Sequence, residues 1–91
     1  MALIHNHKGL KKFDLSDSTA GIKQDHAPRL RRVLSLLKVS DEPSAMNLPG
    51  YRLHALKGDW KGYWSIDVSG NWRIYFKFQD GDVLVEYLDP H

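Results

Sequence analysis

The stretch YWSIDVSGNWRIYFKFQDGDVLVEYL, residues 63–88, decides how this chain folds. Apolar and polar side chains alternate along it with a period of two, which is typical of strands that bury one face. Two turn signals, Ser69-Gly70-Asn71 and Asp80-Gly81, divide it into three strands joined by hairpins. A further strand is predicted at residues 51–56, after the turn signal Pro49-Gly50. The pattern therefore predicts four consecutive strands in an antiparallel meander.

The clearest helix lies upstream of these strands, and its apolar residues recur at helical spacing. They are Ala27, Leu30, Val33, Leu34 and Leu37. Asp25 can accept hydrogen bonds as the N-cap, and Pro28 fits the first turn, where its missing N–H is harmless. The arginine and lysine side chains of this segment lie largely off the apolar stripe. The helix is therefore expected to bury its leucines and to expose its charges.

Three weaker elements are predicted before that helix. Residues 2–4 form a short apolar run that is expected to be an edge strand. A short helix from residue 7 to about residue 13 is expected to be capped by Asn6, although Gly9 weakens it by roughly 1 kcal/mol relative to alanine. Residues 14–21, rich in serine, aspartate and threonine, are predicted to form a loop.

The order of these elements predicts the fold class. Because both helices precede the meander, they cannot alternate with its strands and must cover one face of the sheet. The expected fold is therefore α+β. It is a single two-layer domain over residues 1–91, with the N-terminal helices packed on one face of an antiparallel sheet and the other face open. A chain of 91 residues with 42% hydrophobic and 26% charged residues suits one globular core.

Composition narrows the classes of function. The chain has no cysteine, which excludes disulfides and thiolate metal sites and suits a reducing cytoplasm. No apolar run approaches the roughly 20 residues that span a bilayer, so no membrane association is expected. Residues 1–40 carry eight Lys and Arg against three Asp, whereas residues 41–91 carry five against eight Asp and Glu. The basic half can bind nucleic acid or can be a solvated charged face.

The period of two also predicts which side chains the open face presents. If the apolar side of residues 72–78 packs under the helices, the intervening residues point the other way. The open face is then expected to present His54, Arg73, Tyr75 and Lys77. Lys57 is expected at its rim, and Asp89 and His91 could fold back over it from the last strand. Each of these residues also has a plain structural alternative, as a solvated or turn-forming side chain.

Metal and cofactor sites are not expected. His5, His7 and His26 have no carboxylate or thiolate ligands beside them at useful spacing, so no metal site is predicted. No glycine-rich phosphate loop follows a strand, so neither a nucleotide triphosphate site nor a cofactor is predicted.

Seven short motifs occur in one order along nearly the whole chain. They are His7-Lys8-Gly9-Leu10, Gly21-Ile22, His26-Ala27-Pro28-Arg29-Leu30-Arg31, Pro49-Gly50, Leu53-His54-Ala55-Leu56-Lys57-Gly58, Trp64-Ser65 and Gly70-Asn71-Trp72-Arg73. In these motifs the chain resembles the HigB-type branch of the RelE/ParE toxin superfamily, from bacterial type II toxin–antitoxin systems. The resemblance implies a two-layer, RelE-like fold.

The resemblance also implies a function and partners. A toxin of this kind enters the A site of the 30S ribosomal subunit in the cytoplasm and cleaves mRNA there without a metal ion. A cognate helix-turn-helix antitoxin neutralises it, and operator DNA is bound only through the antitoxin complex. The active surface of similar proteins uses residues that match His54, Lys57 and Arg73, with an acidic-aromatic-His C-terminus. This chain departs from that pattern, because it ends on Asp89-Pro90-His91 where Asp-Tyr-His is common.

These residues suggest a mechanism for cutting a phosphodiester. The 2′-hydroxyl of RNA attacks the adjacent phosphate and leaves a 2′,3′-cyclic phosphate and a free 5′-hydroxyl. His54 and His91 are the acid/base candidates, and Asp89 orients one of them or acts as a base. Lys57 and Arg73 hold the phosphate. The residues expected to bind RNA around the site are Lys8, Lys11, Lys12, Arg29, Arg31, Arg32, Tyr75 and Lys77.

A second class of function stays open at this point. A toxin of the same fold can inhibit without catalysis, as a DNA gyrase poison or as a blocker of the ribosomal A site. The motif at residues 53–58 and the terminal His91 favour the enzyme, because a pure binding protein has no need of them. Pro90 in place of the aromatic residue keeps the binding toxin as the alternative, since an aromatic ring there could stack on a base.

Overall fold

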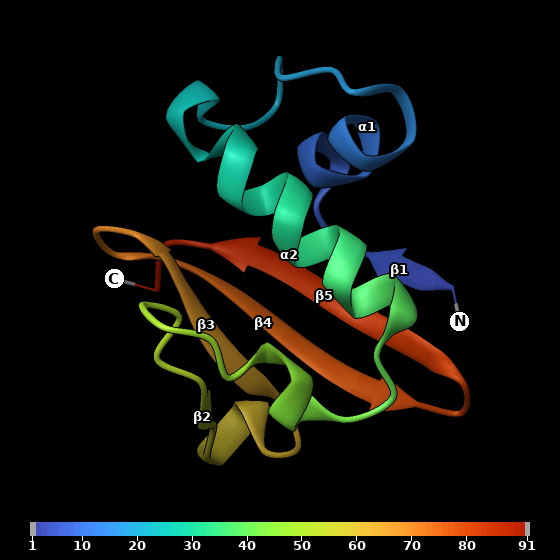
Figure 1. Ribbon diagram of the computed structural model, residues 1–91, viewed down its shortest axis with the longest axis vertical. Helices are drawn as coiled ribbons and strands as arrows, with labels where there is room; N and C mark the ends of the chain where they lie inside the picture. Colours follow the sequence, from blue (N-terminus) through green and yellow to red (C-terminus); the bar gives the residue numbers. More distant parts are fainter. Residues whose placement is uncertain (1, 91) are drawn as a thin grey trace.

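Two N-terminal helices cover one face of a five-stranded sheet in the computed structural model, which describes residues 2–90 (Figure 1). The helices are α1 (Lys8–Ser16) and α2 (Ala27–Val39), and short 3₁₀ turns lie at Gln24–His26, Pro43–Met46 and Gly58–Trp60. The strands are β1 (Leu3–His5), β2 (His54–Ala55), β3 (Trp64–Ser69), β4 (Trp72–Gln79) and β5 (Asp82–Leu88). This two-layer arrangement confirms the predicted α+β class. Within residues 2–90, no helix is both long and apolar enough to cross a membrane.

β1 makes the sheet mixed rather than antiparallel. The predicted meander is correct for β2 to β5, since each strand pairs antiparallel with the next. β1 is an edge strand, as predicted, but it joins β5 in parallel, with Leu3 opposite Val83. A parallel neighbour requires a long connection, which the helices and the rest of the sheet supply (Figure 1). β1 also pairs backbone groups that β5 would otherwise leave at an open edge.

The predicted apolar stripe of α2 packs on the sheet. All five residues of the stripe are buried, and they belong to the same core as the inward side chains of β3, β4 and β5. On β4, Ile74 and Phe76 are fully buried, while Trp72 and Phe78 pack partly buried against this core. The alternation of β4 therefore has the predicted phase, which turns Arg73 and its alternate neighbours toward the open face.

The boundaries of α1 differ from the prediction. The N-cap is His7, whose Nδ1 accepts a hydrogen bond from the Leu10 backbone N–H at 3.0 Å. Asn6 does not cap the helix, because its side-chain amide donates to the Glu86 carboxylate on β5. The helix also runs on to Ser16, so the predicted loop starts at Asp17, where φ is +61°.

The start of α2 differs as well. Asp25 lies in the 3₁₀ turn Gln24–His26, and His26 occupies the cap position without a side-chain bond to the helix. The His26 ring is buried, and its Nδ1 lies 2.7 Å from the Tyr87 hydroxyl on β5. Pro28 lies in the first turn, as predicted.

The strand predicted at residues 51–56 is reduced to the two residues of β2. Gly50 (φ +84°) and Arg52 (φ +53°) adopt the left-handed backbone, which an extended strand does not contain. Tyr51 nevertheless pairs with the sheet, because its carbonyl accepts a hydrogen bond from the Asp67 N–H at 2.7 Å. The loop therefore brings Arg52 and His54 alongside β3.

Candidate active site

Two rows of side chains cross the open face of the sheet. In one row, His54 lies opposite Ser65, and Ser65 lies opposite Tyr75. In the next row, Asp67 lies opposite Arg73. Directly opposed residues of neighbouring strands share a face. Side chains from β2, β3 and β4 therefore converge on one patch.

An open pocket of about 680 Å³ lies over this patch. The pocket is lined by Arg52, Leu53, His54, Ser65, Asp67, Arg73, Tyr75 and Pro90. Pro90 contributes to this lining, so the chain after β5 reaches the pocket. Asp89 is exposed next to Pro90 in the chain, and His91 lies outside the described residues.

Arg73 is held in place by three acceptors. Its Nε lies 3.1 Å from a carboxylate oxygen of Asp67. Its Nη1 donates to the backbone carbonyls of Gly70 at 2.8 Å and Trp72 at 3.0 Å. The side chain is 23% exposed, so the guanidinium is oriented before any ligand arrives and still reaches the solvent of the pocket.

His54 has one ring nitrogen tied to the backbone. Its Nδ1 lies 2.9 Å from the carbonyl oxygen of Arg52. A carbonyl only accepts, so the neutral ring carries its proton on Nδ1 and its lone pair on Nε2. The residue is exposed at the pocket. His54 can therefore accept a proton at Nε2 or, once charged, return one.

Tyr75 faces the predicted side of the sheet but is only 8% exposed. The 3₁₀ turn Gly58–Trp60 folds back over β4, which sets the Trp60 and Tyr75 rings 5.0 Å apart. The Tyr63 ring also packs against Trp60, with the two ring centres 5.1 Å apart. The prediction of an exposed Tyr75 is therefore wrong, although Tyr75 still lines the pocket.

Lys57 and Lys77 both lie outside the lining of the pocket. Lys57 is exposed and immediately precedes the 3₁₀ turn Gly58–Trp60, and its place at the rim stays a prediction. Lys77 is half-buried, and its Nζ lies 5.9 Å from the centre of the Tyr63 ring.

Most of the basic residues predicted to bind RNA lie on the helix layer, behind the sheet. The exposed members of this group are Lys8, Lys11, Lys12, Arg31 and Arg32. Arg31 donates to the Asp17 carboxylate at 2.7 Å, and both side chains are exposed. The helices that carry these cations cover the face of the sheet opposite the open face (Figure 1).

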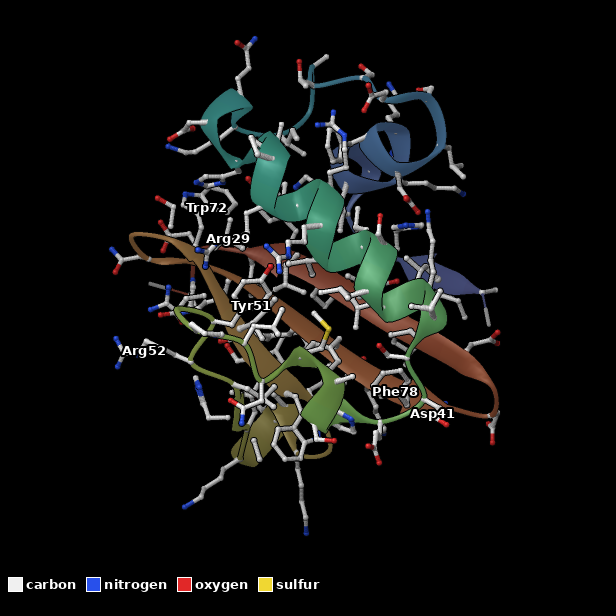
Figure 2. All side chains as sticks on the ribbon, viewed as in Figure 1. Arg29, Asp41, Tyr51, Arg52, Trp72 and Phe78 are labelled. Carbon is white, nitrogen blue, oxygen red and sulfur yellow. The ribbon has the colours of Figure 1, made fainter. Side chains whose placement is uncertain are left out.

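Arg29 is engaged inside the fold. Its Nη1 donates to the carbonyls of Gly50 at 3.3 Å and Asp67 at 3.1 Å. Its guanidinium also lies 4.8 Å from the centre of the Tyr51 ring, and Figure 2 shows the two side chains together beneath α2. These contacts use Arg29 to tie α2 to the loop before β2 and to β3. Arg29 is therefore engaged by the protein itself, and its contact with RNA stays a prediction.

The three histidines near the N-terminus each have a separate structural partner. His5 Nε2 lies 2.9 Å from the Asp14 carboxylate, while His7 caps α1. His26 contacts Tyr87, and burial lowers the pKa of His26 below its ordinary value of 6.5. The part of the chain that the structure describes brings no three His, Asp or Glu side chains together as a metal site.

Three residues of the pocket were not singled out from the sequence alone: Arg52, Ser65 and Asp67. Ser65 is 1% exposed, and its hydroxyl has no hydrogen-bond partner among residues 2–90. The available signal was the alternation itself, since Ser65 and Asp67 point away from the core and Arg52 shares the phase of His54. That signal was not sufficient, because the phase of one strand does not show which residues of two strands meet.

Comparison with known proteins bears on this site. The family model described as RelE-like toxin of type II toxin-antitoxin system HigB matches residues 4–91. The chain is 41% identical over 86 residues to Endoribonuclease HigB of Proteus vulgaris, and this match covers 93% of this chain and 94% of that protein. It is 36% identical over 93 residues to Toxin HigB-1 of Vibrio cholerae, which covers 100% of this chain and 98% of that protein.

The fold is also similar to a solved toxin structure. The crystal structure of YafQ from E. coli strain BL21(DE3) superposes with a TM-score of 0.61 at 23% identity, covering 92% of this chain and 86% of that one. The sequence matches extend over nearly the whole of both relatives and confirm the resemblance seen in the motifs. The chain therefore belongs to the HigB-type, RelE-like toxins of type II toxin–antitoxin systems.

Proposed function

We propose that this toxin is an mRNA endoribonuclease that acts in the ribosomal A site and thereby inhibits translation and growth. The observation that carries the proposal is one pocket that holds both His54, with a defined tautomer, and Arg73, with a fixed guanidinium. Membership of the family and a relative named as an endoribonuclease at 41% identity support the same activity. The proposed target is cytoplasmic, and the substrate is the message on the 30S subunit.

RNA supplies its own nucleophile for this reaction. The 2′-oxygen loses a proton and bonds to the adjacent phosphorus, while the bond from phosphorus to the 5′-oxygen breaks. The departing oxygen takes up a proton, so the products are a 2′,3′-cyclic phosphate and a 5′-hydroxyl. His54 Nε2 is suited to one of these proton transfers, and Asp89 and His91 are proposed for the other. Positioned acid–base groups accelerate such steps by about 10²–10⁴-fold.

Cations stabilise the charge that develops on the phosphate oxygens. Arg73 is proposed for this role because its orientation is set in advance, so little reorganisation is needed at the moment of reaction. Lys57, which is exposed just before the 3₁₀ turn Gly58–Trp60, is proposed to add a second positive charge. The exposed lysines and arginines of the helix layer are proposed to contact ribosomal RNA from the other side.

The toxin is proposed to have a dedicated protein inhibitor. Membership of a type II toxin–antitoxin family supports a cognate antitoxin as its partner. We propose that this antitoxin carries a helix-turn-helix and that operator DNA is bound only through the toxin–antitoxin complex.

The proposal is tested with His54→Ala and His91→Ala in a ribosome-dependent cleavage assay on a defined message. Each variant is expected to cut at least about 100-fold more slowly, since each removes an acid–base group. A message with one 2′-deoxy residue at the cut position is the matched control and should stay intact with the parent toxin. Parent-like cutting by both variants would contradict the assigned roles.

Mapping of new 5′ ends after brief induction separates this function from the binding toxins. Cuts within codons of translated messages are expected. Intact messages with signs of DNA damage would instead indicate gyrase poisoning, and intact messages on stalled ribosomes would indicate a blocked A site.

A further inference from the structure

Arg52 is a cation of the pocket that the proposed mechanism does not use. Its side chain is 81% exposed, and Figure 2 shows it pointing outward from the loop before β2, away from α2. Its Nε lies 3.7 Å from one carboxylate oxygen of Asp67. The other oxygen lies 3.1 Å from Arg73 Nε. One carboxylate therefore lies between two guanidinium groups that line the same pocket.

The backbone of Arg52 is strained in a way that its side chain does not relieve. Its φ of +53° lies in the left-handed region, where a Cβ crowds the backbone. Within residues 2–90, the other residues with a Cβ in this region are Asp17 and Asp80. Aspartate tolerates the conformation because its short carboxylate can bond the local backbone, whereas a long arginine side chain cannot. The arginine side chain therefore does not ease this backbone conformation, and it lies in the lining of the pocket.

The two arginines differ in how firmly they are held. Arg73 is fixed by three acceptors and is 23% exposed, whereas Arg52 has a long ion pair at the rim. A guanidinium matches the oxygens of a phosphate in a bidentate way. If the scissile phosphate lies at Arg73 and His54, the RNA strand carries its neighbouring phosphate along the rim. Asp67 limits the repulsion between the two cations while the pocket is empty of RNA.

We propose that Arg52 binds the backbone phosphate next to the scissile one, and that Asp67 is a positioning residue that holds both arginines ready. This inference rests on the proposed endoribonuclease function and identifies a second phosphodiester that the site recognises. The contact between Arg52 and this neighbouring phosphate is made both before and during the chemical step. Arg52 therefore acts on the affinity for the message and not on the rate of cleavage once the message is bound.

Single-turnover cleavage on programmed ribosomes tests the inference, because it separates the half-maximal toxin concentration from the maximal rate. Arg52→Gly removes the cation and the backbone strain together. We expect it to raise the half-maximal concentration roughly tenfold, as for one charge-assisted contact, with the maximal rate nearly unchanged. Its Tm should stay level or rise, which excludes damage to the fold. Arg52→Lys keeps a charge and should recover part of the affinity.

Asp80→Gly is the matched control. Asp80 has the same φ of +53° but lies in the turn between β4 and β5, outside the pocket lining. We expect this variant to test relief of backbone strain alone and to leave both kinetic constants unchanged.

Messages with a neutral methylphosphonate linkage on one side of the cut or the other complete a double-mutant cycle. With one of the two linkages, the half-maximal concentration of the parent toxin should rise by the same factor that Arg52→Gly causes on the unmodified message. The same linkage should not raise the half-maximal concentration of Arg52→Gly any further. The inference would be overturned if Arg52→Gly bound the message as tightly as the parent does. It would also be overturned if each linkage lowered the affinity of the parent and of Arg52→Gly by the same factor. If the parent leaves every message intact, the proposed nuclease function fails. The same linkages in a toxin–ribosome binding measurement then still test Arg52.

Discussion

At the scale of single residues, the histidines show how surroundings decide the use of one side-chain type. His54 is exposed with one nitrogen turned to a carbonyl, whereas His26 is 3% exposed against Tyr87 and Trp72. Burial lowers the pKa of His26, the charge of Lys23 acts in the same direction, and the charge of Asp25 opposes it. His26 is therefore a neutral part of the core.

This burial predicts acid-sensitive stability. A histidine whose folded pKa lies below its ordinary value of 6.5 takes up its proton more readily when unfolded. Its contribution to the free energy of unfolding is complete above pH 6.5 and is lost as the pH falls from there through the lowered pKa of the folded state. His26→Gln should lower the free energy of unfolding at about pH 7.5 by roughly 1–3 kcal/mol, because the Tyr87 hydroxyl loses a buried partner.

Urea unfolding of the parent and His26→Gln at about pH 7.5 and about pH 5.5 is the measurement. The parent should lose more stability between the two conditions than the variant. Identical losses in the two proteins would contradict the assignment of this sensitivity to His26.

At the scale of elements, α1 is placed by a backbone contact. A Cβ built on Gly9 would lie 2.1 Å from the carbonyl oxygen of Gly21. The glycine that weakens the helix locally is therefore what allows the loop before α2 to close onto it. Both glycines lie in the motifs that carry the family resemblance.

Gly9→Ala is expected to destabilise the fold even though alanine favours helix. The clash is with backbone, which cannot rotate away, so the net cost should be about 1–3 kcal/mol. Lys12→Ala, on an exposed position of the same helix, is the control for helix propensity and should be nearly neutral. Thermal unfolding of the three proteins gives the comparison. A Gly9→Ala protein that melts at or above the parent would show that the loop moves freely.

At the scale of the whole molecule, the pocket and the basic helix layer lie on opposite sides of the sheet. The helices cover one face of the sheet (Figure 1), and His54 and Arg73 line the pocket on the other. A small particle with a reactive face and a separate basic face suits a site with RNA on both sides, where phosphate contacts give affinity without reading sequence.

This arrangement predicts that affinity and chemistry can be separated by mutation. Lys11→Ala combined with Lys12→Ala should weaken ribosome binding and lower the slope of log affinity against log salt by about 0.7–0.9 for each phosphate that is no longer neutralised. The maximal cleavage rate should not change. The Lys11→Arg and Lys12→Arg pair keeps the charge and should bind as the parent does. Binding titrations at several salt concentrations provide the test, and a salt slope equal to that of the parent in the alanine pair would contradict it.

Local patterns predicted most of the fold, and the two errors at the helix starts share one cause. The stripe of α2, the phase of β4 and both hairpins depend on neighbours in the chain, and all are correct. The prediction failed where a distant residue competes for a local group. Asn6 bonds Glu86 instead of capping α1, and His26 packs on Tyr87.

Periodicity, turn residues and motif order along the chain were enough to establish the α+β class, the outward phase of His54 and Arg73, and the family. The parallel pairing of β1, the burial of Tyr75 and the convergence of Arg52, Asp67 and Arg73 on one pocket came from tertiary structure. The physical reason is that a period specifies which way a side chain points within its own strand. The register between strands, and the loops that fold over them, depend on contacts between segments far apart in the chain.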